Sequence, residues 1–216
     1  MHIEVLVEDS SGEKLLAQLL PKILGEQGDR HTWRLKAYKG IGRIPPGLTA
    51  KADPAKRILL DQLPRLLQGY GKTPGIDAVV VVLDTDQRDC KKFLKELKSV
   101  AAGCNPAPRT LFRLAIEEME AWYLGDREAL HTAYPRAKRD VLDRYVQDSV
   151  CNTWELLADA VHAGGATVIK KAGWPLPGQV KHEWAEKIGP FMRTNQNVSP
   201  SFGKFRDGLL RLVLQK

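Results

Sequence analysis

The segment Asp77–Leu83 constrains the fold more than any other, because four successive valines follow Ala78 within it. A half-exposed strand alternates apolar and polar residues, whereas this segment is apolar on both faces. Strands of this kind occur in parallel sheets that carry helices on both sides. The segment therefore predicts the central strand of an α/β protein.

The first half of the chain supplies further strands and helices around this segment. Apolar spacing predicts strands at 1–8, 31–38 and 109–116, and helices at 10–24, near 54–68, at 88–100 and at 117–124. Pro21 is expected to kink the first helix. Strands that alternate with helices predict a mostly parallel sheet flanked by helices. We expect this α/β unit to end near Gly125.

Beyond Gly125 the sequence predicts only helices. These are expected near 127–134, 137–147, 152–162, 180–192 and 202–214, with a glycine- and proline-rich loop at 164–178. We therefore predict two domains. They are an α/β core over residues 1–125 and an all-helical, basic extension over residues 126–216.

The positive charge is concentrated near the C-terminus. The chain has 33 Lys and Arg against 26 Asp and Glu, a formal net charge of +7. Residues 161–216 hold nine of these basic residues and three acidic ones. The excess favours a polyanionic partner such as DNA or RNA, although a merely solvated basic surface explains it equally well.

Six basic side chains are candidates for contacting a nucleic-acid backbone: Arg43, Lys170, Lys171, Lys181, Lys204 and Arg206. Five aromatic residues are candidates for stacking on bases: Trp174, Trp184, Phe191, Phe202 and Phe205. The alternative, which the spacing of Trp184 and Ile188 favours, is that these aromatics fill the core of the helical half. Lys181 and Lys187 would then lie on the opposite face of their helix.

Several classes of protein are excluded. The longest apolar run, Ala78–Leu83, is too short to cross a bilayer, and Glu4 and Glu8 interrupt the apolar stretch that a secretory signal needs. Three cysteines form no CxxC pair, which favours a reduced, cytoplasmic protein without a zinc knuckle. The chain has no HExxH motif, no P-loop and no G-x-S-x-G elbow.

Acidic residues follow three of the predicted strands. Glu8 ends the first strand, Asp84 and Asp86 end the third, and Glu120 follows the fourth in the sequence EEME. Functional groups of open α/β sheets gather at the carboxyl ends of the strands. Carboxylates that converge there repel one another unless a cation lies between them, and oxygen ligands suit Mg²⁺ or Mn²⁺. The pattern therefore predicts a divalent-cation site.

Each acidic residue also has a purely structural explanation. Ser10–Glu13 reads as an S-x-x-E capping box, which would explain Glu13 without chemistry. Asp84 and Asp86 could cap a turn, and Glu117 and Glu118 could complement a helix dipole. The combination is more specific than its parts, because acids end several strands of one predicted sheet.

These motifs resemble those of a known superfamily. VEDSSGEKL at 7–15 resembles the first motif of the TOPRIM superfamily, and VVVLDTD at 80–86 resembles its DxD motif. The spacing of the two glutamates is similar to that in the overcoming-lysogenization-defect (OLD) nucleases. IEEMEAWYLGD at 116–126 and NVSPSF at 197–202 resemble later signatures of a bacterial TOPRIM-like family of unknown function, often encoded beside an AAA-type ATPase.

The resemblance implies roles for individual residues. Glu8 would be a metal ligand or general base, and Asp84 and Asp86 would hold the metal. Glu13 would match the second acid of the nuclease-type members, and Glu120 is a candidate for a further acid. The resemblance also implies that Lys39 or Arg43, in the loop at 39–47, stabilises phosphate charge. Many members have Gly where this chain has Asp9.

The function that the resemblance implies is metal-dependent hydrolysis of phosphodiester bonds in DNA or RNA. The protein would be the effector of an ATPase-coupled phage-defence system. The alternative is a non-catalytic TOPRIM-like subunit that docks on the ATPase partner. Substrate preference, number of metals and oligomeric state are not specified by the sequence.

Overall fold

A computed structural model of the chain describes residues 1–45 and 53–214. Four parallel strands form one sheet in the order β2-β1-β3-β4, which confirms the predicted α/β class. The strands are β1 (His2–Val7), β2 (Thr32–Ala37), β3 (Ala78–Asp84) and β4 (Thr110–Ala115). Residues 46 and 47 of the predicted loop at 39–47 lie outside the described ranges.

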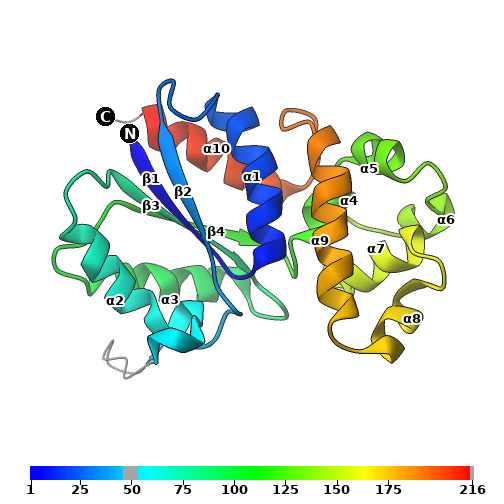
Figure 1. Cartoon of the computed structure of the whole chain (residues 1–216), viewed down its shortest axis with the longest axis horizontal. Helices are drawn as coiled ribbons and strands as arrows, with labels where there is room; N and C mark the ends of the chain where they lie inside the picture. The colour runs from blue at the N-terminus through cyan, green and yellow to red at the C-terminus, as the bar shows by residue number, and fades with distance from the viewer. Residues whose placement is uncertain (46–52, 215–216) are drawn as a thin grey trace.

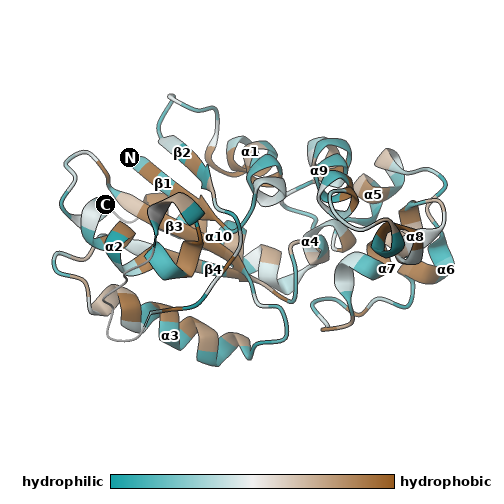
Figure 2. Cartoon of the chain, turned by 60° about the horizontal axis from the view of Figure 1, so that its bottom comes forward, coloured by the Kyte–Doolittle hydropathy of each residue, from teal (hydrophilic) through white to brown (hydrophobic). Residues whose placement is uncertain are grey.

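Helices cover both faces of the sheet, as the all-valine β3 requires. Helices α1 (Ser10–Leu24) and α10 (Pro200–Leu214) lie on one face, and α2 (Leu59–Gly71) and α3 (Cys90–Ala102) lie on the other (Figure 1). Every residue of β3 except Asp84 is buried. Hydrophobic residues are concentrated along the strands, whereas α3 carries both hydrophobic and hydrophilic residues (Figure 2).

Helix α1 begins directly after β1 because Asp9 caps it. The Asp9 side chain accepts a hydrogen bond of 2.7 Å from the Gly12 amide, so Asp9, rather than the predicted Ser10, is the N-cap. The helix continues to Leu24 although Pro21 lies in its last turn. Gly12 is buried, and a Cβ atom there would lie 2.7 Å from Cγ2 of Val7. Glycine therefore lets α1 approach the end of β1.

The second predicted helix is shorter than the sequence pattern indicates. Residues Pro54–Lys56 form a 3-10 turn, and α2 begins only at Leu59. The break falls at Arg57, which has a left-handed φ of 52°. This geometry is incompatible with a continuous α-helix from residue 54.

The helical half differs from its prediction in three places. Its helices are α4 (Glu120–Leu124), α5 (Arg127–Ala133), α6 (Arg139–Leu142), α7 (Thr153–Val161), α8 (Gly165–Ala172) and α9 (Leu176–Ile188), followed by a 3-10 turn, η3 (Gly189–Phe191). The helix predicted at 137–147 is reduced to α6. Helix α8 forms inside the predicted loop, and α9 begins four residues before the predicted start at 180.

Helix α10 returns to the sheet after the other helices have formed a separate group (Figure 1). Its Phe202 and Phe205 are fully buried and pack against Trp122 of α4, with ring centroids 5.5 Å and 4.9 Å from that of Trp122. These rings belong to the same hydrophobic cluster as Val5 of β1. The predicted domain boundary after Gly125 therefore falls within a shared core.

Two further predictions concern cysteines and membrane helices. The three cysteines are free thiols. Within residues 1–45 and 53–214, no helix is long and apolar enough to cross a membrane.

Candidate active site

The order of the strands marks one end of the sheet as the site where ligands bind. The chain leaves β1 for β2 on one side and later returns to β3 on the other side of β1. Helix α1 covers one face and α2 the opposite face (Figure 1). In open α/β sheets the binding crevice usually forms beyond the carboxyl ends of the two strands at such a reversal, and we use the word crevice for this end of the sheet. Glu8 directly follows β1, and Asp84 ends β3.

Glu8 and Asp84 interact strongly at this crevice. Burial, followed by the negative charges of Asp86 and Asp9, raises the pKa of Glu8 to about 7. Burial, followed by the charges of Glu8 and Glu120, raises the pKa of Asp84 well above its ordinary value. The buried Oε2 atom of Glu8 has no hydrogen-bond partner among the residues that the structure describes. A cation or a proton at this position would relieve the repulsion.

Asp86 reaches the same crevice by a different route from the predicted one. The extended conformation ends at Asp84, and Asp86 has a left-handed φ of 49°. Its amide donates a hydrogen bond of 2.9 Å to the carbonyl of Glu117, which ties the end of β3 to the end of β4. Asp84 and Asp86 therefore do not lie on one face of an extended strand. The Asp86 side chain is 51% exposed and lies 3.6 Å from Arg88.

Glu117 has a structural role at the edge of the crevice. Its carboxylate accepts hydrogen bonds from the amides of Cys151, Asn152 and Thr153 at 2.8–3.0 Å, and from the Thr153 hydroxyl. Burial opposes its charge, but these hydrogen bonds keep the pKa of Glu117 below its ordinary value. Glu117 therefore holds the start of α7, and the predicted helix at 117–124 begins only at Glu120.

Lys181 of α9 inserts between the carboxylates that follow β4. Its Nζ atom lies 3.3 Å from Glu118 and 3.4 Å from Glu120. The Lys181 side chain is 20% exposed, and that of Glu120 is 5% exposed. Burial opposes the charge of Lys181, but Glu120, Glu118 and Asp84 hold its pKa above the ordinary value. We call Glu8, Asp84, Asp86, Glu118 and Glu120 the acidic cluster.

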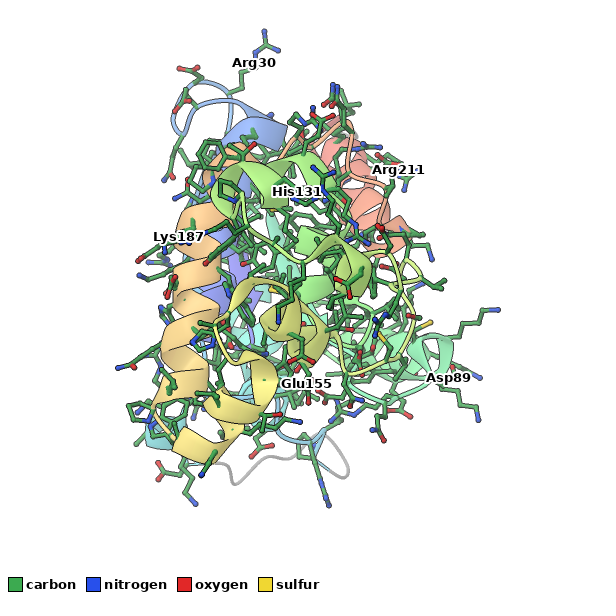
Figure 3. The ribbon with its side chains drawn as sticks, turned by 90° about the vertical axis from the view of Figure 1, so that its right-hand side faces the viewer. Arg30, Asp89, His131, Glu155, Lys187 and Arg211 are labelled. Carbon is green, nitrogen blue, oxygen red and sulfur yellow. The ribbon has the colours of Figure 1, made fainter. Side chains whose placement is uncertain are left out.

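The prediction that Lys181 lies opposite Trp184 is wrong. Trp184 and Ile188 are buried, and Lys181 precedes them by three and seven residues on the same side of α9. The spacing of three and seven residues to Trp184 and Ile188 is the signal that could have placed Lys181 on the core-facing side of α9. Lys187, by contrast, lies on the outer side of α9 and pairs with Glu183 at 2.7 Å (Figure 3). Glu118 was predicted only to complement a helix dipole. Like Lys181, it lies at the acidic cluster although the sequence did not place it there.

Burial, followed by the charge of Glu120, raises the pKa of Glu118 to about 7. Burial also raises the pKa of Tyr123 well above its ordinary value, and the charges of Glu120, Asp9 and Asp84 add to the effect. Tyr123 is buried in the interior near these carboxylates. Charges interact more strongly in such a buried setting than in water.

Other residues predicted for the site lie around its margin. Glu13 is partly exposed, and its side chain makes no hydrogen bond or ion pair within the described ranges. Lys39 and Arg43 are exposed in the loop after β2. This loop is fixed next to β1, because the Gly40 amide donates a hydrogen bond of 3.1 Å to the carbonyl of Glu8.

The remaining basic candidates lie on helices of the C-terminal half. Lys170 pairs with Glu155 at 2.8 Å, and Figure 3 shows Glu155 on α7. Lys171 and Lys204 are exposed. Arg206 pairs with the adjacent Asp207 at 2.7 Å. The structure thus brings none of these four side chains into the acidic cluster.

The acidic cluster fits Mg²⁺ or Mn²⁺ in part. Its donors are all carboxylate oxygens, and Glu8 offers an unpartnered oxygen beside Asp84. In the part of the chain that the structure describes, no three His, Cys, Asp or Glu side chains are placed to hold a metal, so the predicted set of Glu8, Asp84 and Asp86 is not formed. Mg²⁺ commonly binds one or two carboxylates and completes its shell with water and phosphate. Glu8 and Asp84 meet this smaller requirement.

Comparisons with known proteins add one match. A family model described as a domain of unknown function (DUF4276) matches residues 7–210. The match spans the whole acidic cluster and reaches α10. No curated protein and no solved structure matches the chain.

Proposed function

Because the chain belongs to the DUF4276 family, whose function is unknown, its activity must be argued from its own site, and we propose that it is a metal-dependent nuclease. The observation that carries this proposal is the meeting of Glu8 and Asp84 at the switch point between β1 and β3. Their mutual repulsion favours a divalent cation. The resemblance to TOPRIM motifs supports a phosphodiester of DNA or RNA as the substrate.

Glu8 and Asp84 would hold the cation, with Asp86 close to Glu8. When bound, Mg²⁺ or Mn²⁺ would supply positive charge to the scissile phosphate and increase the acidity of water. The unpartnered Oε2 atom of Glu8 is available to accept a proton from water. The pKa of Glu8 is about 7 in the absence of a cation, and a bound cation would lower it and keep the carboxylate ionised at neutral pH.

Lys181 would reduce the negative charge that a polyanionic substrate meets at the same site. Its charge offsets those of Glu118 and Glu120, which would otherwise repel a phosphodiester. The two salt bridges also hold α9 against the loop after β4. We regard Lys181 as a positioning residue, because its contacts are to carboxylates of the protein.

A second candidate function is a non-catalytic subunit that docks on an AAA-type ATPase. The observation that favours it is the absence, among residues 1–45 and 53–214, of a ready-made group of three metal ligands. Lys181 would then be the permanent counter-ion of the acidic cluster, which would serve as a scaffold. In either form we propose a cytoplasmic protein that acts in phage defence, on the basis of the TOPRIM resemblance.

The test is cleavage of plasmid DNA, single-stranded DNA and RNA with Mg²⁺, Mn²⁺ or EDTA. The nuclease proposal expects metal-dependent cleavage that Asp84→Asn reduces at least about 100-fold. Asp140→Asn is the matched control, since Asp140 is 71% exposed and pairs with Arg144, away from the acidic cluster. Absence of metal-dependent cleavage in the presence of a partner ATPase would refute the proposal that the protein is a nuclease. Binding to the ATPase that survives Asp84→Asn would then support the non-catalytic subunit.

A further inference from the structure

A hollow of about 440 Å³ lies between the start of α1 and α9. Six of its lining residues carry the argument: Ser10, Trp174, Gly178, Gln179, His182 and Glu183. Ser10 follows Asp9, whose charge acts on both Glu8 and Lys181. His182 follows Lys181, which pairs with Glu118 and Glu120. The hollow is thus linked to the acidic cluster through Asp9 and Lys181, the chain neighbours of two of its lining residues.

Trp174 is the most unusual residue of this hollow. Its side chain is 84% exposed, whereas Trp33, Trp122 and Trp184 are buried. The six-membered ring of Trp174 packs close to Gly178, because a Cβ atom on Gly178 would be 3.0 Å from the ring atoms Cζ3 and Cη2. Glycine thus lets the indole approach the first turn of α9. A large, exposed aromatic ring is suited to stacking a flat ligand.

Polar groups beside the ring can recognise the edge of such a ligand. The Ser10 hydroxyl and Nε2 of His182 are 2.8 Å apart. The Gln179 side-chain amide makes no hydrogen bond within residues 1–45 and 53–214, and it offers both a donor and an acceptor. The donors and acceptors on the edge of a nucleobase match this set.

The charge of the hollow favours an uncharged ring over a phosphate. Lys14 pairs with Glu186, and Glu183 pairs with Lys187 at 2.7 Å, so the acidic and basic side chains around the hollow offset one another. A phosphate would meet no excess of positive charge there. A neutral nucleobase would lose little hydration energy and would gain the stacking contact.

We propose that the Trp174 hollow binds an unpaired nucleobase of the nucleic acid whose backbone crosses the acidic cluster. This inference rests on the proposed nuclease function, and it specifies single-stranded DNA or RNA as the substrate class. The faces of a base inside a duplex are covered by its neighbours and its edge is paired. The hollow therefore selects against continuous duplex.

The test measures binding of short, labelled oligonucleotides by fluorescence anisotropy in the Asp84→Asn background with Mg²⁺. Each sequence is used as single-stranded DNA, single-stranded RNA and DNA duplex. We expect Trp174→Ala to weaken single-strand binding about 10-fold or more and to leave duplex binding unchanged. The DNA and RNA arms show which strand supplies the base. Trp174→Phe should retain part of the affinity.

Val198→Ala is the control, because Val198 is an exposed apolar residue outside the hollow, at 63% exposure. Thermal unfolding of Trp174→Ala should match that of its parent, since the side chain is exposed. Unchanged single-strand binding in Trp174→Ala overturns the inference, as does an equal loss of single-strand and duplex binding. A selective loss without any cleavage by the wild type supports the nucleobase site and refutes the nuclease.

Discussion

Glu8 occupies a position in which its ionised form is opposed by burial and by two neighbouring carboxylates, Asp86 and Asp9. Glu4, four residues earlier on the same strand, is also buried, but salt bridges to Arg34 and Lys36 keep its pKa below the ordinary value despite burial. The two glutamates therefore differ because only Glu4 has cationic partners at close range. A destabilised carboxylate at a sheet switch point agrees with the proposed cation site.

This difference predicts the pH dependence of stability in metal-free buffer. The pKa of Glu8 rises from its ordinary 4.5 in the unfolded chain to about 7 in the folded one. Between these values the folded state binds more protons, so the free energy of unfolding falls as pH rises. We expect Glu8→Gln to make the decrease in the free energy of unfolding across this pH range smaller by about 2 kcal/mol. Urea unfolding at several pH values measures that decrease.

Glu96→Gln is the control for that series, because Glu96 is exposed on α3. Its pH profile should overlay that of the wild type. If Glu8→Gln leaves the slope unchanged, the carboxylate repulsion described for the site is wrong.

At the scale of the elements, the contact of α1 with the end of β1 depends on Gly12. A Cβ atom at this position would lie 2.7 Å from Val7 and 2.9 Å from Sδ of Met119. Helix α1, which forms one wall of the Trp174 hollow, can therefore pack against the strand end that precedes Glu8 only because residue 12 has no side chain.

We expect Gly12→Ala to lower the free energy of unfolding by about 1–3 kcal/mol, because the methyl group overpacks this contact. Gly69→Ala in α2 is the matched control, since a Cβ atom there meets nothing within 4 Å. That change should stabilise the protein by about 0.5–1 kcal/mol. Equal effects of the two substitutions in chemical denaturation would contradict the role of Gly12.

The elements that the sequence predicted incorrectly depend on distant partners. The helix expected at 137–147 is limited to α6, and the segment after it is tied to the start of α10, because the Asp148 carboxylate accepts hydrogen bonds from Ser199 and Ser201. Helix α8 begins at the second of two glycines, where the Asp159 carboxylate accepts a hydrogen bond of 2.7 Å from the Ala166 amide. Local periodicity contains no information about such partners.

At the scale of the whole molecule, the helical half and the sheet share one hydrophobic core. We expect Phe205→Ala to lower the free energy of unfolding by about 3–5 kcal/mol, since the ring is fully buried against Trp122. Because the core is shared, the sheet and the helices should unfold in one transition. Far-ultraviolet circular dichroism and tryptophan fluorescence give two independent probes of that transition.

The control is Phe191→Ala, which removes a ring of the same size from the surface. Its stability should stay within about 0.5 kcal/mol of the wild type. Two separate transitions in Phe205→Ala, with the sheet the more stable part, would instead support independent domains at 1–125 and 126–216.

The sequence predicted that Glu8 and Asp84 lie at the same end of the sheet, but it did not predict that the ammonium group of Lys181 joins them. Residues that directly follow β1 and β3 must lie at one edge of a parallel sheet, so Glu8 and Asp84 follow from strand order alone. Lys181 comes from a helix nearly 100 residues after β3, and its place depends on how α9 packs against α1. That packing is tertiary information, which the charge count of the C-terminal quarter does not contain.

The origin of Lys181 so late in the chain has a consequence during synthesis. A ribosome that has released the four strands exposes Glu8, Asp84 and Glu120 before α9 exists. The carboxylates then repel one another without their internal cation, and α10 has not yet covered the sheet. The site therefore becomes complete only when nearly the whole polypeptide has emerged, and a prematurely terminated chain carries the acids in an unassembled form.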